Sequence, residues 1–395
     1  MTHRRTSPWR AARAVVAAGL LAVATACTEQ TTEPTPTPPV GSLALVPNLR
    51  AEDLSADGAT VLLTDPFSST AEFYFYDIAA GTTTLKGAAG DALADFTTGI
   101  SNGLRVSAIH GIPEQAGLWE QATNWLDLGN IYSAGCVVDD LSGAQNMSGG
   151  WDIDSAGHAA VGLVWNGCNA EAFYWSDAGG AGAFTTLDQL GTGLPDGEGG
   201  YGAPVSRATV VSDNGMVAAG WASDTATVGG YTYGIDRRPA IWQSNGVGML
   251  IPGGTAFSTD SPGEVLAIGG DGSVVVGVWN QKPFVYSAAL GAIDLAPGDF
   301  FGYAQAVALD GQLVFGTYTE GFFGNPVPFV WTQAGGLKSI LDIAAENDIT
   351  LPENYWWQAI VAASADGSVV VGVAYDEAFN LNTYVLKLPV SAYGL

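Results

Sequence analysis

The sequence predicts an all-β fold: a β-propeller of seven four-stranded blades, with six or eight blades as alternatives. Three observations support this prediction, namely a phrase repeated about every 50 residues, a high glycine content and few charged residues. The 395-residue chain contains 53 glycines, and 13% of its residues are charged, against roughly 25% in a usual soluble domain. Many turns joining short apolar strands are therefore expected.

Residues 1–26 predict a signal peptide. Arg4, Arg5, Arg10 and Arg13 precede an uncharged run of small and apolar residues over 14–26. At 13 residues this run is too short to cross a hydrocarbon core of about 30 Å, so a cleaved peptide is favoured over a permanent membrane span.

The small residues directly before Cys27 resemble the lipobox of bacterial lipoproteins, in which that cysteine is lipidated and becomes the mature N-terminus. Ala24 stands where that family usually has Leu. The resemblance implies lipidation of Cys27, and cleavage near Ala26 without lipidation is the alternative. The protein is therefore expected to be exported and held at the cell envelope by this anchor, its one contact with the membrane, or otherwise secreted.

Residues 27–40 combine the anchor cysteine with a Thr/Pro-rich linker. The stretch TEQTTEPTPTPP has almost nothing apolar to bury, so it favours extended, polyproline-like conformations. The remaining chain, residues 41–395, is the predicted propeller domain.

Seven copies of one phrase fill this domain. Clear copies are VLAIGGDGSVVVG (265–277) and IVAASADGSVVVG (360–372). Each copy predicts four strands: one into the turn, one out of it through the Val-rich run, one ending in an aromatic residue and one with Asp-Leu. The turns are expected to be two-residue hairpins in which glycine supplies positive φ. Their glycines are Gly58, Gly103, Gly157, Gly215, Gly272, Gly311 and Gly367.

Two further segments complete the predicted ring. The last copy has only three strands, whereas residues 42–46 form a strand-like segment before the first copy, so we expect these residues to supply the missing strand and close the ring. Residues 338–357 predict a short surface helix between blades six and seven, which stops before Pro352.

Large aromatic residues recur at one position of the copies. We expect them to pack between neighbouring sheets, and an aromatic platform for carbohydrate is the alternative. These residues are Trp119, Trp175, Trp242, Tyr286 and Trp331.

The copies resemble the HAF-type extracellular repeat proteins of bacteria over roughly residues 50–390. The matching segments are 363–372, AFYW at 172–175 and PFVW at 328–331. Members of that family are secreted or attached to the cell surface. The resemblance implies a propeller-like fold and an extracellular location, but no reaction.

The net charge of −26 excludes nucleic acid as a partner, because no basic face can neutralise phosphates. Anionic membrane surfaces are poor partners for the same reason. Apart from the anchor, the cysteines are Cys136 and Cys168, which predict one disulfide in an oxidising compartment. Two separately buried thiols are the alternative.

No catalytic, cofactor-binding or metal-binding residue is assigned. Ser101 matches a G-x-S-x-G pattern but lies in a repeat turn with no helix after it. His110 and His158 have no partner at a suitable spacing. Asp152 and Asp154 begin like a calcium loop without its later ligands, and the two carboxylates of residues 195–201 leave calcium open as a ligand.

The leading functional hypothesis is a monomeric, non-catalytic propeller that presents its loops for binding or adhesion to a protein or glycan. The alternative is a secreted, propeller-type hydrolase that acts on a glycan or phosphate ester with loop-bound calcium. A third hypothesis is a purely structural component of the cell envelope.

Overall fold

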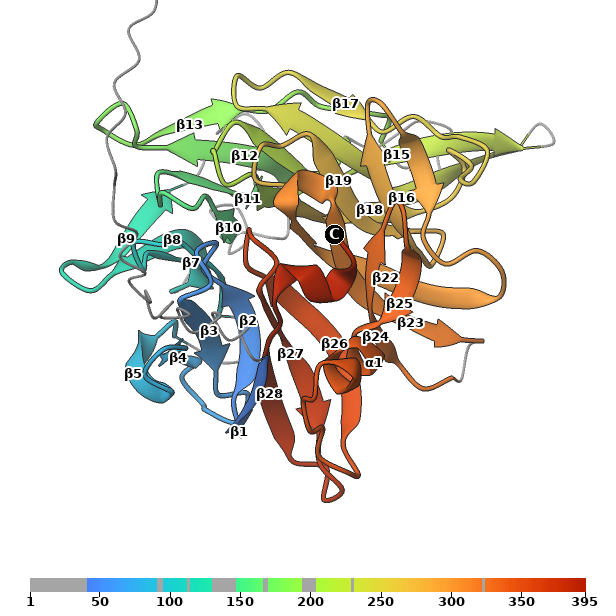
Figure 1. Ribbon diagram of the computed structural model, residues 1–395. Helices are drawn as coiled ribbons and strands as arrows, with labels where there is room; N and C mark the ends of the chain where they lie inside the picture. The colour runs from blue at the N-terminus through green and yellow to red at the C-terminus, as the bar shows by residue number, and fades with distance from the viewer. Residues whose placement is uncertain are drawn as a thin grey trace, which may run out of the picture. The chain divides into compact units, whose positions relative to one another are not determined.

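The chain folds into seven antiparallel sheets of four strands, arranged as blades around a common centre (Figure 1). The computed structural model describes residues 41–90, 95–111, 114–129, 147–165, 170–193, 204–228, 231–321 and 324–395. The predicted all-β propeller is confirmed, with seven blades rather than six or eight.

Six blades are formed by four strands that follow one another along the chain, the first strand lying innermost. Blades one to three contain β2 (Arg50–Leu54), β3 (Thr60–Thr64), β4 (Glu72–Asp77), β5 (Thr82–Ala88), β6 (Phe96–Ile100), β7 (Val106–His110), β8 (Gln115–Glu120), β9 (Asn124–Gly129), β10 (Ser148–Ile153), β11 (Ala159–Trp165), β12 (Ala170–Ser176) and β13 (Ala183–Thr186).

Blades four to six repeat the same order. They contain β14 (Ser206–Val211), β15 (Val217–Val228), β16 (Tyr231–Gln243), β17 (Gly248–Leu250), β18 (Gly263–Ile268), β19 (Val274–Trp279), β20 (Lys282–Ser287), β21 (Gly291–Asp294), β22 (Phe300–Ala308), β23 (Leu313–Glu320), β24 (Val327–Thr332) and β25 (Gly336–Ser339).

Blade seven joins the two ends of the ring. It consists of β26 (Trp356–Ala363), β27 (Val369–Tyr375), β28 (Leu381–Lys387) and, as its outermost strand, β1 (Ser42–Pro47). β1 pairs antiparallel with β28, from Ser42 opposite Lys387 to Pro47 opposite Asn382. The predicted closure by residues 42–46 is therefore confirmed.

Apolar side chains fill the spaces between neighbouring blades. The second strand of each blade is buried at almost every position, so both faces of the sheet are covered. Between blades five and six, Val276 packs in one cluster with Val314 and Trp331. The recurring aromatic residues Trp119, Trp175, Trp242, Tyr286 and Trp331 are all buried, which confirms that they pack between sheets.

The repeat turns differ from the two-residue hairpins expected from the sequence. In blade one, five residues connect β2 to β3, and only Gly58 has positive φ, at 70°. The buried Ser55 side chain accepts a hydrogen bond from the Thr60 amide at 3.0 Å, which requires the longer loop. In blade two the left-handed position is taken by Leu104, at φ 64°, and not by Gly103.

Hydrogen bonds join each turn to the turn of the next blade and form a closed ring. Their lengths are 2.8–3.3 Å. In order they run from Asp57 N–H to Asn102 Oδ1, Asn102 N–H to Ser155 O, Ser155 Oγ to Asp213 O, Asn214 N–H to Gly270 O, Asp271 N–H to Asp310 Oδ1, Leu309 N–H to Ala365 O and Ala365 N–H to Ala56 O.

A β-bulge interrupts every innermost strand at the same place, and the bulged residue lines the central cavity. The bulged residues are Glu52, Thr98, Trp151, Thr209, Leu266, Gln305 and Val361. The bulge in β18 pushes the Glu264 carbonyl oxygen against Gly277 of β19, where a Cβ would collide with it. The glycine that ends each clear Val-rich run is therefore required by the bulge opposite.

The predicted helix is present as α1 (Ile340–Glu346), between the last strand of blade six and the first of blade seven. Ser339 caps it by accepting a hydrogen bond from the Asp342 amide at 3.3 Å, and Ile340, Ile343 and Ala344 are buried. Two short 3₁₀ turns, Leu309–Gly311 and Val390–Tyr393, complete the helical structure of the described residues. Within the same ranges, no helix is long and apolar enough to span a membrane.

Replacing Gly277 by alanine should destabilise the ring, because the added methyl group has no room beside the Glu264 carbonyl. We expect a loss of about 2 kcal/mol in the free energy of unfolding, measured by urea denaturation. Gly179→Ala is the matched control, since nothing lies within 4 Å of a Cβ there. Equal stability of the two variants would contradict the role given to the bulge.

Candidate functional site

The ring has two different faces. The innermost strands all start at one face. We call it the loop face, because it also carries the loops that connect the second and third strands of the blades, such as the loop between β3 and β4. The innermost strands end at the opposite face, the turn face, which carries the ring of hydrogen-bonded turns. Because antiparallel strands alternate in direction, each loop can be assigned to one face from its place in the blade.

Exposed aromatic side chains occur on the loop face alone among the described residues. Six aromatic residues are exposed, and each lies in a loop of this face or in the half of a strand nearer to it. The other exposed large apolar residues in the described ranges are Leu, Met or Val. The six aromatic residues are Phe67, Phe96, Tyr233, Tyr303, Trp356 and Phe379.

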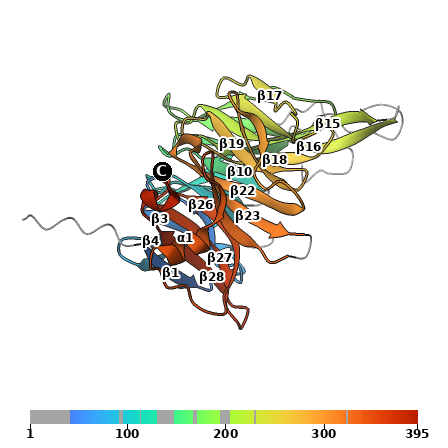
Figure 2. The same ribbon diagram turned by 45° about the vertical axis from the view of Figure 1, so that its right-hand side comes forward.

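One hairpin of the loop face extends well beyond the ring. Strands β15 and β16 are 12 and 13 residues long, and both project outward from blade four (Figure 2). Tyr233 lies on this hairpin. At its base, Asp224 of β15 forms an ion pair with the buried Arg238 of β16 at 2.7 Å, which joins the two strands of the hairpin.

The centre of the ring contains an acidic cavity of about 330 Å³. All seven innermost strands line it, and four carboxylates face it, those of Glu52, Asp53, Asp152 and Asp213. No Lys, Arg or His is among its described lining residues. The cavity therefore disfavours anions.

The cavity changes the acidity of its carboxylates. Burial, and to a smaller extent repulsion by Asp213 and Glu52, raises the pKa of Asp53 from 3.8 to about 7. Burial and repulsion by Asp53 also raise the pKa of Asp152 well above its usual range. Burial raises the pKa of Asp213 as well. The cavity thus favours the protonated forms of these carboxyls more than water does.

Two of these carboxylates connect neighbouring blades. Asp53 accepts a hydrogen bond from the Ile100 amide of blade two, and Asp152 accepts one from the Val211 amide of blade four, both at 2.8 Å. The innermost strand of each blade is a sheet edge with unpaired amides, and these aspartates satisfy two of them. The acidic residues thus have a structural role in the ring.

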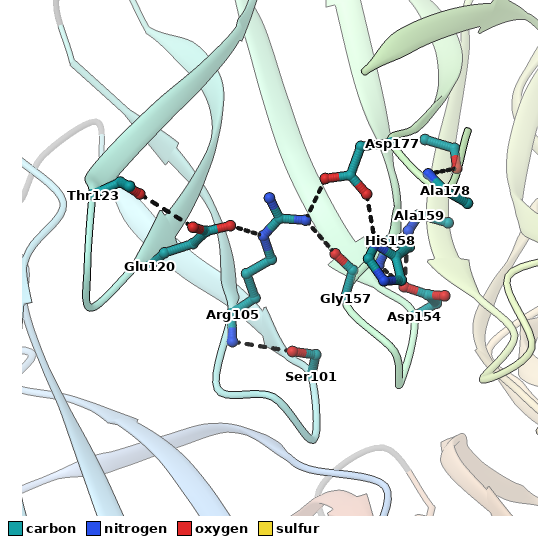
Figure 3. Close-up of polar contacts among 11 residues, drawn as sticks. Ser101, Arg105, Glu120, Thr123, Asp154, Gly157, His158, Ala159, Asp177 and Ala178 are labelled. Carbon is teal, nitrogen blue, oxygen red and sulfur yellow. Dashed lines mark hydrogen bonds and ion pairs between the residues drawn. The ribbon is translucent and has the colours of Figure 1, made fainter. Parts of the chain in front are cut away.

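A second charged cluster joins blades two and three at the turn face (Figure 3). Arg105 forms ion pairs with Glu120 of its own blade and with Asp177 of the next, and donates to the Gly157 carbonyl at 2.6 Å. Burial raises the pKa of Asp177, but hydrogen bonds from Arg105 and His158 outweigh it, so the net pKa is lowered. Each charged side chain of this cluster has a partner, as in a structural ion pair network.

A third cluster lies between blades four and five. The buried Glu264 pairs with both Arg207 and Arg237, and the Arg207 guanidinium stacks on the ring of Trp151, 4.6 Å from its centroid. Arg237 lies 5.1 Å from the ring of Trp221. These arginines are bound to carboxylates and aromatic rings, so they do not form a phosphate pocket.

The structure assigns turn or packing roles to the residues that were candidates for chemistry. Ser101 is buried and accepts the Arg105 amide at 3.0 Å, and Asp154 accepts the amides of His158 and Ala159. His110 stacks on Trp125 and contacts Asp127 at 2.6 Å, and the exposed His158 contacts Asp177 at 2.7 Å.

Asp152 faces the central cavity rather than a calcium loop. No group of three or more His, Cys, Asp or Glu residues in the described ranges could hold a metal ion.

Several predictions concern residues that lie outside the described ones. These are the signal peptide, the linker, the lipidation of Cys27, the disulfide between Cys136 and Cys168, and the carboxylates of the 195–201 loop. They stay predictions.

No protein-family model matches the chain, and no curated protein matches its sequence. The structure is similar to an oligogalacturonate lyase in complex with manganese, with 12% identity and a TM-score of 0.50 over 89% of this chain and 92% of that one. The β-propeller domain of the Trilobed protease from Pyrococcus furiosus is 9% identical, with a TM-score of 0.49 over 88% and 93%.

These likenesses concern the fold alone. The chain is a seven-bladed β-propeller, and its resemblance to HAF-type repeats stays a prediction.

The raised pKa of Asp53 predicts a pH-dependent stability. A carboxyl with a higher pKa in the folded than in the unfolded chain stabilises the fold when protonated, so the free energy of unfolding should fall as pH rises from about 4 to about 7. Asp53→Asn keeps an acceptor for the Ile100 amide and removes the charge. We expect a smaller difference in Tm between pH 5 and pH 8 than in the wild type.

The control for this experiment is Asp348→Asn, which changes an exposed carboxylate far from the cavity lining. It should keep the wild-type difference in Tm. If Asp53→Asn also keeps that difference, Asp53 is ionised in the folded protein and the cavity does not favour its protonated form.

Proposed function

We propose that the protein is a binding module of the cell envelope, and that the loop face of the propeller recognises its ligand. The observation that carries this proposal is the segregation of all six exposed aromatic side chains of the described residues to that face. An exposed aromatic ring has few hydrogen-bonding options and a large apolar surface, so exposed rings confined to one face are typical of recognition surfaces.

The direction of the chain supports this arrangement. The chain joins the ring at Ser42, at the turn-face end of β1, because Ser42 pairs with Lys387 at the end of β28. The loop face is therefore the face away from the point where the ring is joined to the preceding residues. In a lipid-anchored protein, this arrangement would leave the loop face free to meet an external ligand.

The clusters described above favour binding over catalysis as the working hypothesis. Arg105, Arg207 and Glu264 are all engaged in ion pairs that join blades. The carboxylates of the central cavity accept backbone amides, and their raised pKa values follow from burial and mutual repulsion. A structural role accounts for each of these groups, whereas the exposed aromatic residues of the loop face have no such explanation.

Lipidation can be tested at the anchor cysteine. In a bacterial host fed an alkyne-tagged fatty acid, the wild-type chain should become labelled, and Cys27→Ser should not. Cys136→Ser is the matched control and should keep the label. An unlabelled wild type, or a labelled Cys27→Ser variant, would contradict lipidation of Cys27.

Ligand binding can be tested with the exported chain carrying Cys27→Ser, which keeps it in solution. The probes are a printed array of purified glycans together with immobilised collagen and mucin. We expect binding to at least one probe, and a loss of at least tenfold in affinity in the double variant Trp356→Ala/Phe379→Ala. These rings lie 4.4 Å apart at the loop face and are 50% and 65% exposed.

The control double variant is Met216→Ala/Leu290→Ala, which removes exposed apolar side chains from the turn face. It should bind as the wild type does. Absence of binding to every probe would overturn the proposed function, and so would equal losses in the two double variants.

A further inference from the structure

We infer that a groove between blades six and seven, at the loop face, is a binding site for an uncharged polysaccharide chain. This inference rests on the proposed function and names the ligand class and the place of binding. The groove has a volume of about 400 Å³, within the range of small-ligand sites. Four of its lining residues are aromatic: Phe301, Tyr303 and Tyr318 from blade six, and Tyr375 from blade seven.

The walls of the groove are built by strands that are longer than their counterparts. The innermost strands β22 and β26 have nine and eight residues, whereas those of the other five blades have five or six. The extra residues precede the shared bulge, so they extend the strands at the loop face. Blades six and seven thus project beyond their neighbours and enclose the groove between them.

A second β-bulge, in β26, supports a binding site at the groove. β26 has the bulge common to all innermost strands and another between Trp357 and Ala359, and no other innermost strand has two. The residue inserted by this bulge is Gln358, which lines the groove. Bulges often re-aim a side chain beside a binding site, and here the re-aimed side chain is an amide.

Polar groups of the groove are available to a ligand. Within the described ranges, neither the side-chain amide of Gln358 nor the hydroxyls of Tyr303 and Tyr375 form a hydrogen bond. An amide both donates and accepts, and a phenol does the same. Together these groups can bind hydroxyls that act as donor and acceptor at once, as those of a sugar do.

The position of Tyr318 is fixed by its neighbours. Its ring meets the ring of Phe300 edge to face, with centroids 5.3 Å apart, and lies 6.1 Å from the ring of Phe329. Such contacts hold the aromatic wall in place before a ligand arrives, which lowers the entropy lost on binding.

The charge of the lining selects among ligand classes. No Asp, Glu, Lys, Arg or His is among the described residues that line the groove, in a chain of net charge −26. A uronate or phosphate would find no cation to pair with and would be repelled by the chain as a whole. A cationic ligand would lose its hydration without a carboxylate in return.

The shape and chemistry of the lining favour a sugar over an apolar peptide. No Leu, Ile or Met is present among the described lining residues, which combine Tyr rings with hydroxyl and amide groups. A pyranose ring has apolar C–H faces and a polar rim. Flat aromatic rings can cover those faces while the Gln358 side chain binds the rim. The Thr319 hydroxyl donates to the Gly321 carbonyl at 3.0 Å and can still accept from a sugar hydroxyl.

The inference is tested with neutral hexasaccharides in titration calorimetry, using the exported chain carrying Cys27→Ser. The probes are cellohexaose, xylohexaose, mannohexaose, laminarihexaose and maltohexaose, with a hyaluronan hexasaccharide as the anionic comparison. We expect at least one neutral hexasaccharide to bind and the anionic one not to bind. Tyr303→Ala and Tyr375→Ala should each weaken binding at least tenfold, and Gln358→Ala about fivefold.

The matched control is Leu290→Ala. Leu290 is 38% exposed and Tyr303 is 40% exposed, but Leu290 lies between β20 and β21 at the turn face. This variant should bind as the wild type does, and Tm values should show that all variants are folded.

Three results would overturn the inference: binding of the anionic sugar alone, binding of no hexasaccharide, or binding that survives both tyrosine substitutions. The proposed function would still stand if an array probe binds and is lost in Trp356→Ala/Phe379→Ala. If nothing binds in either experiment, both the inference and the proposed function are wrong.

Discussion

The structure depends on one constraint: every blade is apolar on both faces, so every blade needs a neighbour on each side. An open row of seven such sheets would leave two apolar faces in water, and only closure into a ring removes them. The pairing of β1 with β28 provides this closure by placing residues from opposite ends of the domain in one sheet. The hydrogen-bonded turns then lock the blades together at one face.

Closure also explains why the two faces differ. At the turn face the strands converge on the ring of turns, and every turn must stay close enough to the next to form a hydrogen bond with it. At the centre the bulges bring seven backbones close together, which buries carboxylates such as Asp53 and Asp152. The loop face is free of these restrictions, so strand length and loop sequence can vary there. Blades six and seven differ from the other blades at this face, where their innermost strands are longer.

The sequence was sufficient for the fold because its determinants are local. The turn phrase recurs in every blade, and the closing strand is visible as a segment without a place in its own copy. Local sequence did not predict the turn of blade two, where Leu104 rather than Gly103 has positive φ. The residue with positive φ lies one position later than expected, and its position depends on how the two strands of the turn pair. Local sequence also did not predict the turn length, which the buried Ser55 side chain sets.

The site could be predicted less well than the fold. The glycine at the end of the Val-rich run is visible in the sequence. The reason for it, the bulge in the paired strand, becomes clear only when the register of the two strands is known. The acidic cavity joins residues from copies about 100 residues apart, such as Asp53 and Asp152. The groove depends on how far two strands extend past their bulges and on the second bulge at Gln358, and neither property leaves a pattern in composition or spacing.

The direction of β1 has a mechanical consequence. A force that reaches the ring through residue 41 pulls along the axis of this strand, starting from Ser42, while the hydrogen bonds to β28 lie across it. All six residue pairs between the two strands would then resist together, in shear, instead of opening one after another. In a propeller closed in this way, the strand pair that completes the apolar core would also bear a force applied at residue 41.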